Sequence, residues 1–362
     1  MMPEHTLYPM LLAPIFKDKI WGGRMMEKLL NKPLPSGLMI GESWELSAYR
    51  EDITHVVNGP LAGTLLTDLF RERPRELTGR VPTADEEFPL LTKFIDSNQL
   101  LSLQVHPPDS YALEHDGEYG KTECWYIVYA RPGASIIRGL VPGTSPEELR
   151  QGLETGRDLE KILRSFEVAA GDFIFMPTGV VHAIGEGTIV LEIEQNSDMT
   201  YRLHDWGRLG DDGKPRPTHI DKGMDVIDFN DRAPVKTEGM SYFEGGNRIT
   251  HLASCKYFSA ELLELESTYR LDTRGKTFVV LTVVGGAAVI AGEEGEQVRA
   301  RKGDTVLLPA EPGLSTVVPE AGKGGRGVRI VKASIDPAHE SFVEPLIQRG
   351  VAMEKIEEHI FR

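Results

Sequence analysis

The chain has 362 residues, with 40 Lys plus Arg against 55 Asp plus Glu, so its formal net charge is −15. A chain this acidic lacks the clustered basic side chains that neutralise phosphates, so no nucleic-acid partner is expected. With 40% hydrophobic and 26% charged residues the composition is ordinary for a globular protein, and the length suggests two to three domains of about 150 residues each.

Targeting and membrane signals are the next class to consider. Residues 1–16 carry no basic residue ahead of their apolar stretch, unlike a secretory signal or a transit peptide. The longest uncharged stretch, Thr277 to Gly292, is shorter than the roughly 20 residues that a spanning helix needs. Cys124 and Cys255 form no CxxC pair, which suits a reducing compartment. We therefore expect a cytoplasmic protein with no membrane span, and nothing indicates an obligate protein partner.

The chain is predicted to be mainly β. Short runs of β-branched and aromatic residues recur between Gly, Pro, Asn and Asp, as in Phe173 to Met176, Ile189 to Ile193, Phe278 to Val284 and Thr305 to Leu308. One segment differs, because residues 145–166 have helical spacing and begin with a Ser145 cap followed by Pro146. The pattern predicts a small helical insert at about residues 144–167.

A weak internal repeat indicates two related barrels. Gly171 to Pro177 and Gly303 to Pro309 each combine a Gly-Asp turn, four strand residues and a proline at the same spacing. Such phrases also arise by chance, and only together with the β pattern do they favour a duplication. We place a domain boundary near residues 235 to 245, which gives a metal-binding domain over 1–240 and a second domain over 241–362.

Candidate metal ligands come from three segments of the first domain. Gln104 and His106 alternate onto one face, Lys121 and Glu123 share a face before an apolar strand, and His182 follows a glycine turn. Taken singly, each has an ordinary explanation as a turn histidine, a solvated charge or a loop residue. Together an amide oxygen, two imidazoles and a carboxylate suit a catalytic metal site better than a structural one, which would usually contain thiolates.

The second domain lacks this set. By the repeat, Thr316 stands where a histidine would be required, and the likely interior stretches Phe278 to Val284 and Val306 to Leu308 are apolar. We expect one metal per chain, bound by the first domain, and a packed second domain that supports it.

The motifs resemble those of a known superfamily. Gly171, Pro177, Gly179 and His182 match the second motif of the cupin jelly-roll family, and Gln104-Val-His106 with Glu123 matches the first, with glutamine in place of its leading histidine. Within that superfamily the chain closely resembles the type I mannose-6-phosphate isomerases in their short bacterial form. The resemblance runs from Tyr8 to Trp206 and is carried by Lys93, Gln104-Val-His106-Pro, Gly120-Lys-Thr-Glu123, Pro177-Thr-Gly-Val-Val-His182-Ala-Ile-Gly and Glu194-Gln-Asn-Ser-Asp198-Met-Thr-Tyr-Arg202.

This resemblance implies a fold, an activity and a site. The fold would be mainly β, with two cupin-like (jelly-roll) β-barrel domains and the small helical insert. The activity would be interconversion of mannose 6-phosphate and fructose 6-phosphate, with a small sugar phosphate as substrate. Zinc would be bound by Gln104, His106, Glu123 and His182, Arg202 would be the active-site arginine, and Lys93, Lys121 and Asp198 match further site positions.

Elementary chemistry agrees with this assignment. Aldose–ketose isomerisation forms an enediolate, which is costly unless a cation stabilises its developing oxyanion. A chain of charge −15 also repels a sugar phosphate at long range, so capture requires a local cationic pocket. Lys93, Lys121 and Arg202 could form it. The alternative for Arg202 is a structural ion pair with Asp198 or Asp205.

Several points stay open at this level. The proton could be moved by Lys121, Asp198, His204 or metal-bound water. The phosphate could be held by Lys214, Arg216 or Lys222, because the Thr-Pro-Lys motif of longer members is absent. Zn, Mn, Co and Fe all suit the ligand set.

The sequence leaves open an alternative role for two neighbouring carboxylates and two alternative functions for the chain. Glu192 and Glu194 share one strand face and could be an acid/base pair as in glycosidases, but we expect the commoner case, the solvated side of a strand. Other functions compatible with the sequence are a non-catalytic sugar-binding cupin and a cupin oxidoreductase.

Overall fold

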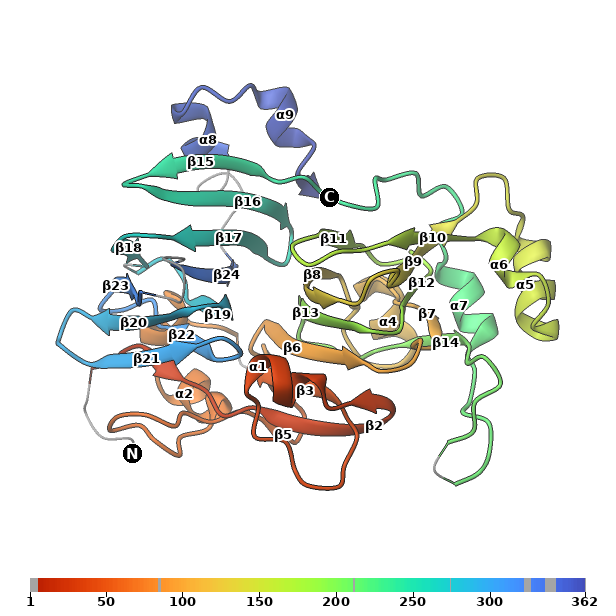
Figure 1. The fold of residues 1–362 in the computed structure, drawn as a ribbon, viewed down its shortest axis with the longest axis horizontal. Coiled ribbons are helices and arrows are strands. Elements are labelled where there is room, and N and C mark those ends of the chain that lie inside the picture. Colours follow the sequence, from red (N-terminus) through yellow and green to blue (C-terminus); the bar gives the residue numbers. More distant parts are fainter. Residues whose placement is uncertain are drawn as a thin grey trace.

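A computed structural model describes residues 6–83, 86–210, 212–273, 275–321, 327–335 and 343–361. Residues 1–5, the start of the segment assessed above for a targeting signal, lie outside this range. Two β-rich halves lie side by side along the long axis (Figure 1). No helix in the described ranges is both long and apolar enough to cross a membrane.

The first half contains two antiparallel sheets. One has the strand order β11-β8-β13-β6-β3-β2 and the other β10-β9-β12-β7-β14. Their strands are β2 (Ile15–Gly23), β3 (Ile40–Leu46), β6 (Leu90–Ser97), β7 (Leu103–Val105), β8 (Glu123–Ala130), β9 (Ser135–Leu140), β10 (Leu163–Glu167), β11 (Phe173–Met176), β12 (His182–Ile184), β13 (Thr188–Gln195) and β14 (Tyr201–His204). Trp125 and Val190 from the first sheet pack with Ile136 and Ile184 from the second, so the two sheets face each other across an apolar core.

The second half repeats this plan. Its larger sheet has the order β1-β22-β19-β24-β17-β16-β15, with β25 added beside β16, and its smaller sheet has the order β18-β23-β20-β21. Their strands are β1 (Met10–Leu11), β15 (Met240–Glu244), β16 (Asn247–Cys255), β17 (Ser259–Leu265), β18 (Tyr269–Asp272), β19 (Val279–Gly285), β20 (Ala287–Gly292), β21 (Gln297–Arg301), β22 (Thr305–Leu308), β23 (Leu314–Pro319), β24 (Val328–Ser334) and β25 (Ile360–Phe361). A separate pair joins β4 (Ala48–Tyr49) to β5 (Asp52–Ile53).

The mainly β fold with two cupin-like jelly-roll units, predicted from the sequence, is confirmed. In the described chain each half consists of two facing sheets, without full closure into one continuous barrel. Jelly rolls are built from two such sheets. The two repeat segments also adopt the same local structure, since Gly171 and Gly303 both have φ of 99° and each precedes a four-residue strand.

The proposed boundary near residue 240 stays a prediction. Strand β15 begins at Met240, but β1, from the start of the chain, pairs with β22 of the second half. The interior of the second half is filled by aliphatic side chains such as Leu281 and Ile330. It also holds charged side chains, because Glu261 pairs with Lys332 and lies 2.8 Å from His251 Nδ1.

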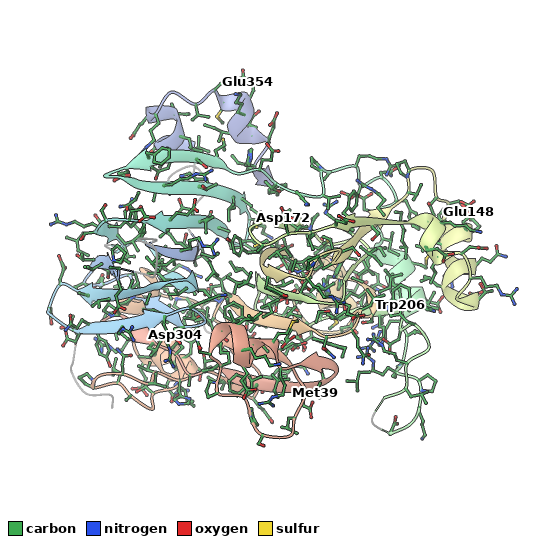
Figure 2. All side chains as sticks on the ribbon, in the orientation of Figure 1. Met39, Glu148, Asp172, Trp206, Asp304 and Glu354 are labelled. Carbon is green, nitrogen blue, oxygen red and sulfur yellow. The ribbon has the colours of Figure 1, made fainter. Side chains whose placement is uncertain are left out.

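Short helices surround the sheets. They are α1 (Met25–Leu30), α2 (Leu66–Glu72), α3 (Pro74–Thr78), α4 (Asp109–His115), α5 (Pro146–Thr155), α6 (Leu159–Ile162), α7 (Ile220–Val226), α8 (Glu344–Gln348) and α9 (Met353–Glu357). Helices α5 and α6 are the predicted insert, and Figure 2 shows Glu148 of α5 at the outer edge of the molecule. The prediction was wrong at its end, because Leu163–Glu167 form strand β10 and pair with β9 instead of continuing the helix.

The contact between the halves explains another error. On β13, Leu191 and Ile193 pack into a core shared with the second half, which contributes Ala260, Val280 and Val331. The alternate side chains Glu192 and Glu194 therefore point into the first half, where they are 3% and 0% exposed. They are not the solvated side of a strand, because both faces of β13 are covered.

Candidate metal centre

The predicted ligands meet between the two sheets of the first half. His182 at the start of β12 lies opposite Gln104 of β7 in the antiparallel register. His106 directly follows β7, and Glu123 begins β8 in the facing sheet. Three segments that are distant in sequence thus present polar side chains to one point.

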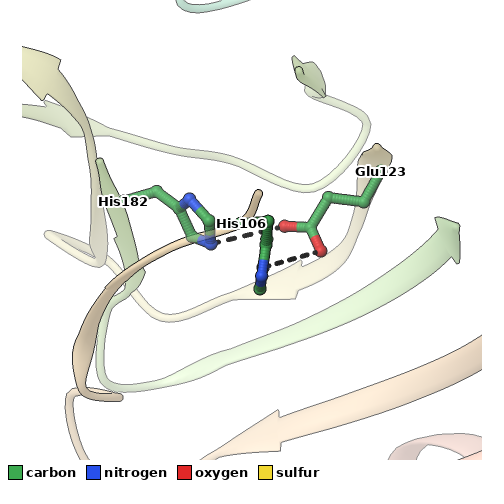
Figure 3. Close-up of side chains that lie close together, drawn as sticks. All are labelled: His106, Glu123 and His182. Carbon is green, nitrogen blue, oxygen red and sulfur yellow. Dashed lines mark ion pairs between the residues drawn. The ribbon is translucent and has the colours of Figure 1, made fainter. Parts of the chain in front are cut away.

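The geometry of this cluster is tight. Glu123 contacts both imidazoles, with Oε2 at 3.3 Å from His106 Nε2 and Oε1 at 3.5 Å from His182 Nε2 (Figure 3). The Gln104 amide nitrogen is 3.1 Å from His182 Nε2. The two histidines and the glutamate are buried.

Backbone carbonyls determine which nitrogen of each imidazole ring carries the proton. His106 Nδ1 is 2.7 Å from the Met199 carbonyl oxygen, and His182 Nδ1 is 2.8 Å from that of Val180. Since a carbonyl can only accept, each Nδ1 carries the proton and donates it. The Nε2 lone pairs then face Glu123, as in histidines oriented for metal binding.

The pKa values keep these donors deprotonated near neutral pH. Burial, together with the charge of Lys121, lowers the pKa of His106 to about 4, and burial lowers the pKa of His182. Burial alone would raise the pKa of Glu123, but Lys121 beside it holds that pKa well below its usual range.

These residues fit a divalent metal ion. The Nε2 atom of His106 and the Oε1 atom of Glu123 are buried and lack a hydrogen-bond partner among the described residues. Lone pairs that converge with no proton between them repel one another, and a cation at their centre would remove that repulsion. Binding would also require the Gln104 amide to turn its oxygen inward.

A buried network of charges adjoins the ligands. Lys93 Nζ is 2.9 Å from both Glu194 Oε1 and Asp198 Oδ1, and 3.3 Å from Glu192 Oε2. Lys121 contacts Glu194 and the ligand carboxylate Glu123. The carboxylates raise the pKa of both lysines, although burial opposes this.

This network has a charge deficit. Two ammonium groups, Lys93 and Lys121, face four carboxyl groups, Glu123, Glu192, Glu194 and Asp198, so the acidic groups outnumber the basic ones and a cation at the ligands would be stabilised. Burial and the charge of Glu192 raise the pKa of Glu194 well above its usual range. Sequence reasoning missed Glu192 and Glu194 as site residues, and the apolar run around them, typical of a strand buried on both faces, was the available signal.

A cavity of about 260 Å³ opens beside this cluster. It is lined by Lys19, Trp21, Glu42, Lys93, Ile95, Leu101, Ser102, Gln104, Lys121, Glu192, Asp198, Thr200, Arg202 and Arg216. The structure thus brings Lys93, Lys121, Asp198 and Arg202 together as predicted. Lys19, Trp21 and Glu42 come from the N-terminal strands β2 and β3, and no motif in the sequence had indicated them.

Arg202 reaches the cavity without a carboxylate partner among the described residues. Its Nη1 donates to the Pro217 carbonyl at 2.9 Å, and its buried Nε finds no hydrogen-bond partner in the described part of the chain. The alternative ion pair is not formed, because Asp198 binds Lys93 and Asp205 binds Arg216 at 2.6 Å. Burial and the nearby Arg216 lower the pKa of Arg202.

The candidates predicted for phosphate binding and proton transfer differ in whether they line the cavity. Arg216 lines the cavity, whereas Lys214 is exposed outside it and Lys222 pairs with Asp116. His204 accepts a hydrogen bond from the Trp206 backbone at 3.1 Å and lies beside the end of α5, so it does not reach the cavity.

Comparisons with known proteins agree with this geometry. Residues 10–128 match the family model of the type I phosphomannose isomerase catalytic domain, and residues 248–321 match that of the mannose-6-phosphate isomerase cupin domain. The mannose-6-phosphate isomerase of Streptococcus mutans is 38% identical over 301 residues, which span 83% of this chain and 92% of that protein. Mannose-6-phosphate isomerase ManA of Bacillus subtilis is 39% identical over 309 residues, 84% of this chain and 94% of that protein.

A solved structure extends the likeness to three dimensions. The crystal structure of the mannose 6-phosphate isomerase from Bacillus subtilis superposes with a TM-score of 0.81 at 33% identity, covering 91% of this chain and 99% of that one. The metal ion that this family implies matches the cluster of His106, Glu123 and His182. The chain therefore belongs to the type I phosphomannose isomerase family.

Proposed function

We propose that this chain interconverts D-mannose 6-phosphate and D-fructose 6-phosphate in the cavity beside His106, Glu123 and His182. The observation that carries this is the convergence of unprotonated nitrogen and oxygen donors next to a cavity lined with lysine and arginine. Such a site combines a cation position with a local attraction for a sugar phosphate.

Zinc is the ion we propose, one per chain, held by Gln104, His106, Glu123 and His182. Two imidazoles with two oxygen donors suit Zn²⁺, although the same set accepts other divalent metals. When bound, the ion would supply positive charge for the oxyanions of an enediolate.

The surrounding side chains divide the remaining chemistry. Lys121 stays protonated among its carboxylates and supplies a fixed positive charge near the ligands. We assign proton transfer at the substrate carbon to Asp198 because it lines the cavity. Lys93 holds its pKa at about 2 in spite of its burial, which keeps it ionised but makes it a weak base. Arg202 stabilises the negative charge that develops during the transfer.

The phosphate would be held by Arg216 together with Arg202. The planar fork of a guanidinium matches phosphate oxygens, and both arginines line the cavity. Asp205 orients Arg216 through hydrogen bonds of 2.8 and 2.6 Å. This assignment supplies the anchor that the missing Thr-Pro-Lys motif leaves open.

The test couples fructose 6-phosphate formation to a downstream reporter and measures metal content on the same sample. We expect turnover of mannose 6-phosphate by the wild-type chain and loss of both metal and turnover in His182→Ala. The matched control is His55→Ala, an exposed histidine, which should retain both. Sugar binding without turnover would indicate the non-catalytic alternative, and oxygen consumption would indicate an oxidoreductase.

A further inference from the structure

A hydrogen-bond network links the second half of the molecule to the segment that carries Lys121. Its centre is Asp109, at the start of α4. Asp109 Oδ1 accepts from the Gly120 backbone N–H and from Gln195 Nε2, both at 2.9 Å. Its other oxygen, Oδ2, accepts from the Tyr257 hydroxyl at 2.7 Å.

Gln195 extends the network to the far side of Lys121. Its side-chain oxygen accepts from the Thr122 N–H at 2.8 Å, and its own backbone N–H donates to the Thr122 carbonyl at 3.2 Å. The backbone on both sides of Lys121 is therefore fixed by Asp109, directly or through Gln195. Glu123, the proposed metal ligand, follows immediately.

The segment is also closely packed at Gly120. A Cβ added there would lie 2.6 Å from the Pro107 carbonyl oxygen and 2.6 Å from the Asp109 backbone nitrogen. The Lys121 N–H donates to the same carbonyl at 3.3 Å. A small displacement of Asp109 would thus be transmitted to Lys121 and Glu123.

Tyr257 is the contribution of the second half. It lies in the turn between β16 and β17, 148 residues from Asp109 in sequence, and is half-buried. Lys256 also lies near Asp109, with its Nζ 3.7 Å from Oδ2. Its side chain is 74% exposed, so its ion pair could only weakly replace the hydrogen bond from Tyr257.

We propose that Tyr257, acting through Asp109, is a positioning residue that holds Lys121 and Glu123 in place for catalysis. This inference rests on the proposed isomerase function. It gives the second half, whose described residues supply none of the proposed metal ligands, a defined role in the site. A phenol donating to a carboxylate is a charge-assisted bond, which is strong enough to fix geometry.

The test compares Tyr257→Phe with the wild-type chain, both saturated with zinc. Loss of the hydroxyl should lower kcat about 10-fold with KM nearly unchanged, as for other residues that orient a ligand from outside. The control Tyr242→Phe, on a half-buried ring of β15, should leave kcat unchanged. Thermal unfolding should show similar midpoints for both variants.

A double-mutant cycle identifies the route. If Tyr257 acts through Asp109, then Tyr257→Phe should have no further effect on kcat in an Asp109→Ala background. Full additivity of the two losses, or an unchanged kcat in Tyr257→Phe, would overturn the inference. If either variant fails to fold, Asp109→Asn takes the place of Asp109→Ala and Tyr257→Leu, which also lacks a side-chain donor, that of Tyr257→Phe.

A second readout does not depend on turnover. The dissociation constant for Zn²⁺, measured by competition with a chelating dye, should rise about 10-fold in Tyr257→Phe because Glu123 is displaced. An unchanged constant would contradict the inference. A wild-type chain that binds zinc but does not turn over mannose 6-phosphate would contradict the proposed function alone.

Discussion

Arg202 has an unneutralised guanidinium at the cavity wall, in a molecule of strong negative charge. A single preorganised donor of this kind is worth about 100-fold to 1000-fold in kcat when it meets charge that develops only in the transition state. A structural arginine would instead hold a carboxylate, and Arg202 holds none among the described residues.

We therefore expect Arg202→Ala to lower kcat by about 100-fold to 1000-fold with little change in thermal stability. Arg202→Lys should not restore the rate, because an ammonium lacks the planar fork. Steady-state kinetics and thermal unfolding on the same preparations check this. A normal kcat in a protein of lowered stability would contradict the assignment.

Asp96 gives a separate prediction on pH and stability. Its Oδ2 accepts from the Met26 N–H at 3.0 Å, and burial raises its pKa from 3.8 to about 6. As pH rises from 4 to 6, the unfolded chain releases this proton while the folded chain retains it, so folding loses stability. Above pH 6 the loss is complete, at about 3 kcal/mol for a shift of this size.

Asp96→Asn removes this titration and keeps an oxygen that can accept from Met26. The free energy of unfolding of the variant, measured in urea at pH values from 4 to 7, should rise relative to the wild type by about 2 to 3 kcal/mol. A difference in unfolding free energy that does not change with pH would show that the pKa of Asp96 is not raised in the folded protein.

At the scale of elements, strand β13 shows how the site is made. Ile189, Leu191 and Ile193 bind the two halves together, and the alternate residues are directed into the metal-binding half. The period of two was visible in the sequence. The sequence could not show which face of β13 is exposed to solvent, because that depends on how a sheet of the second half packs against this strand.

Helix α5 offers an element whose stability should be independent of function. Ser145 Oγ accepts from the Glu148 N–H at 3.2 Å, and Glu148 in return accepts from the Ser145 N–H at 2.8 Å. Ser145→Ala should lower the free energy of unfolding by about 1 kcal/mol. Because α5 lies at the outer edge of the molecule (Figure 2), kcat should not change. A lowered kcat would show that this insert communicates with the site.

For the whole molecule, the apolar cores are built without the metal site. Among the described residues, two apolar clusters lie in the first half, a large and a small one lie in the second, and another joins the halves. We expect chelation to abolish turnover while far-ultraviolet circular dichroism stays near that of the loaded protein, unlike the behaviour of a zinc finger. The unfolding midpoint should fall only by the amount that zinc binding to the folded state contributes to stability. Added zinc should restore activity.

Metal stoichiometry tests whether the chain has a single metal site, located in the first half. The intact chain should bind one equivalent of zinc, and His182→Ala should bind none at the same free concentration. Two equivalents in the wild type, or one retained by the variant, would contradict a single site in the first half. The intact chain is the right sample, because removing the second half would expose the core shared across β13.

The sequence by itself determined the β-rich class, the repeated segment and the proposed ligand set, since these depend on local periods, turn residues and donor chemistry. Gln104, His106, Glu123 and His182 were recognisable because their residue types and strand positions are local properties.

Only the tertiary structure decided the burial of Glu192 and Glu194, the exclusion of His204 and Lys222 from the cavity, and the reach of Tyr257 to Asp109. Each depends on which surfaces meet across the fold. A one-dimensional period names the two faces of a strand but does not say what covers each of them.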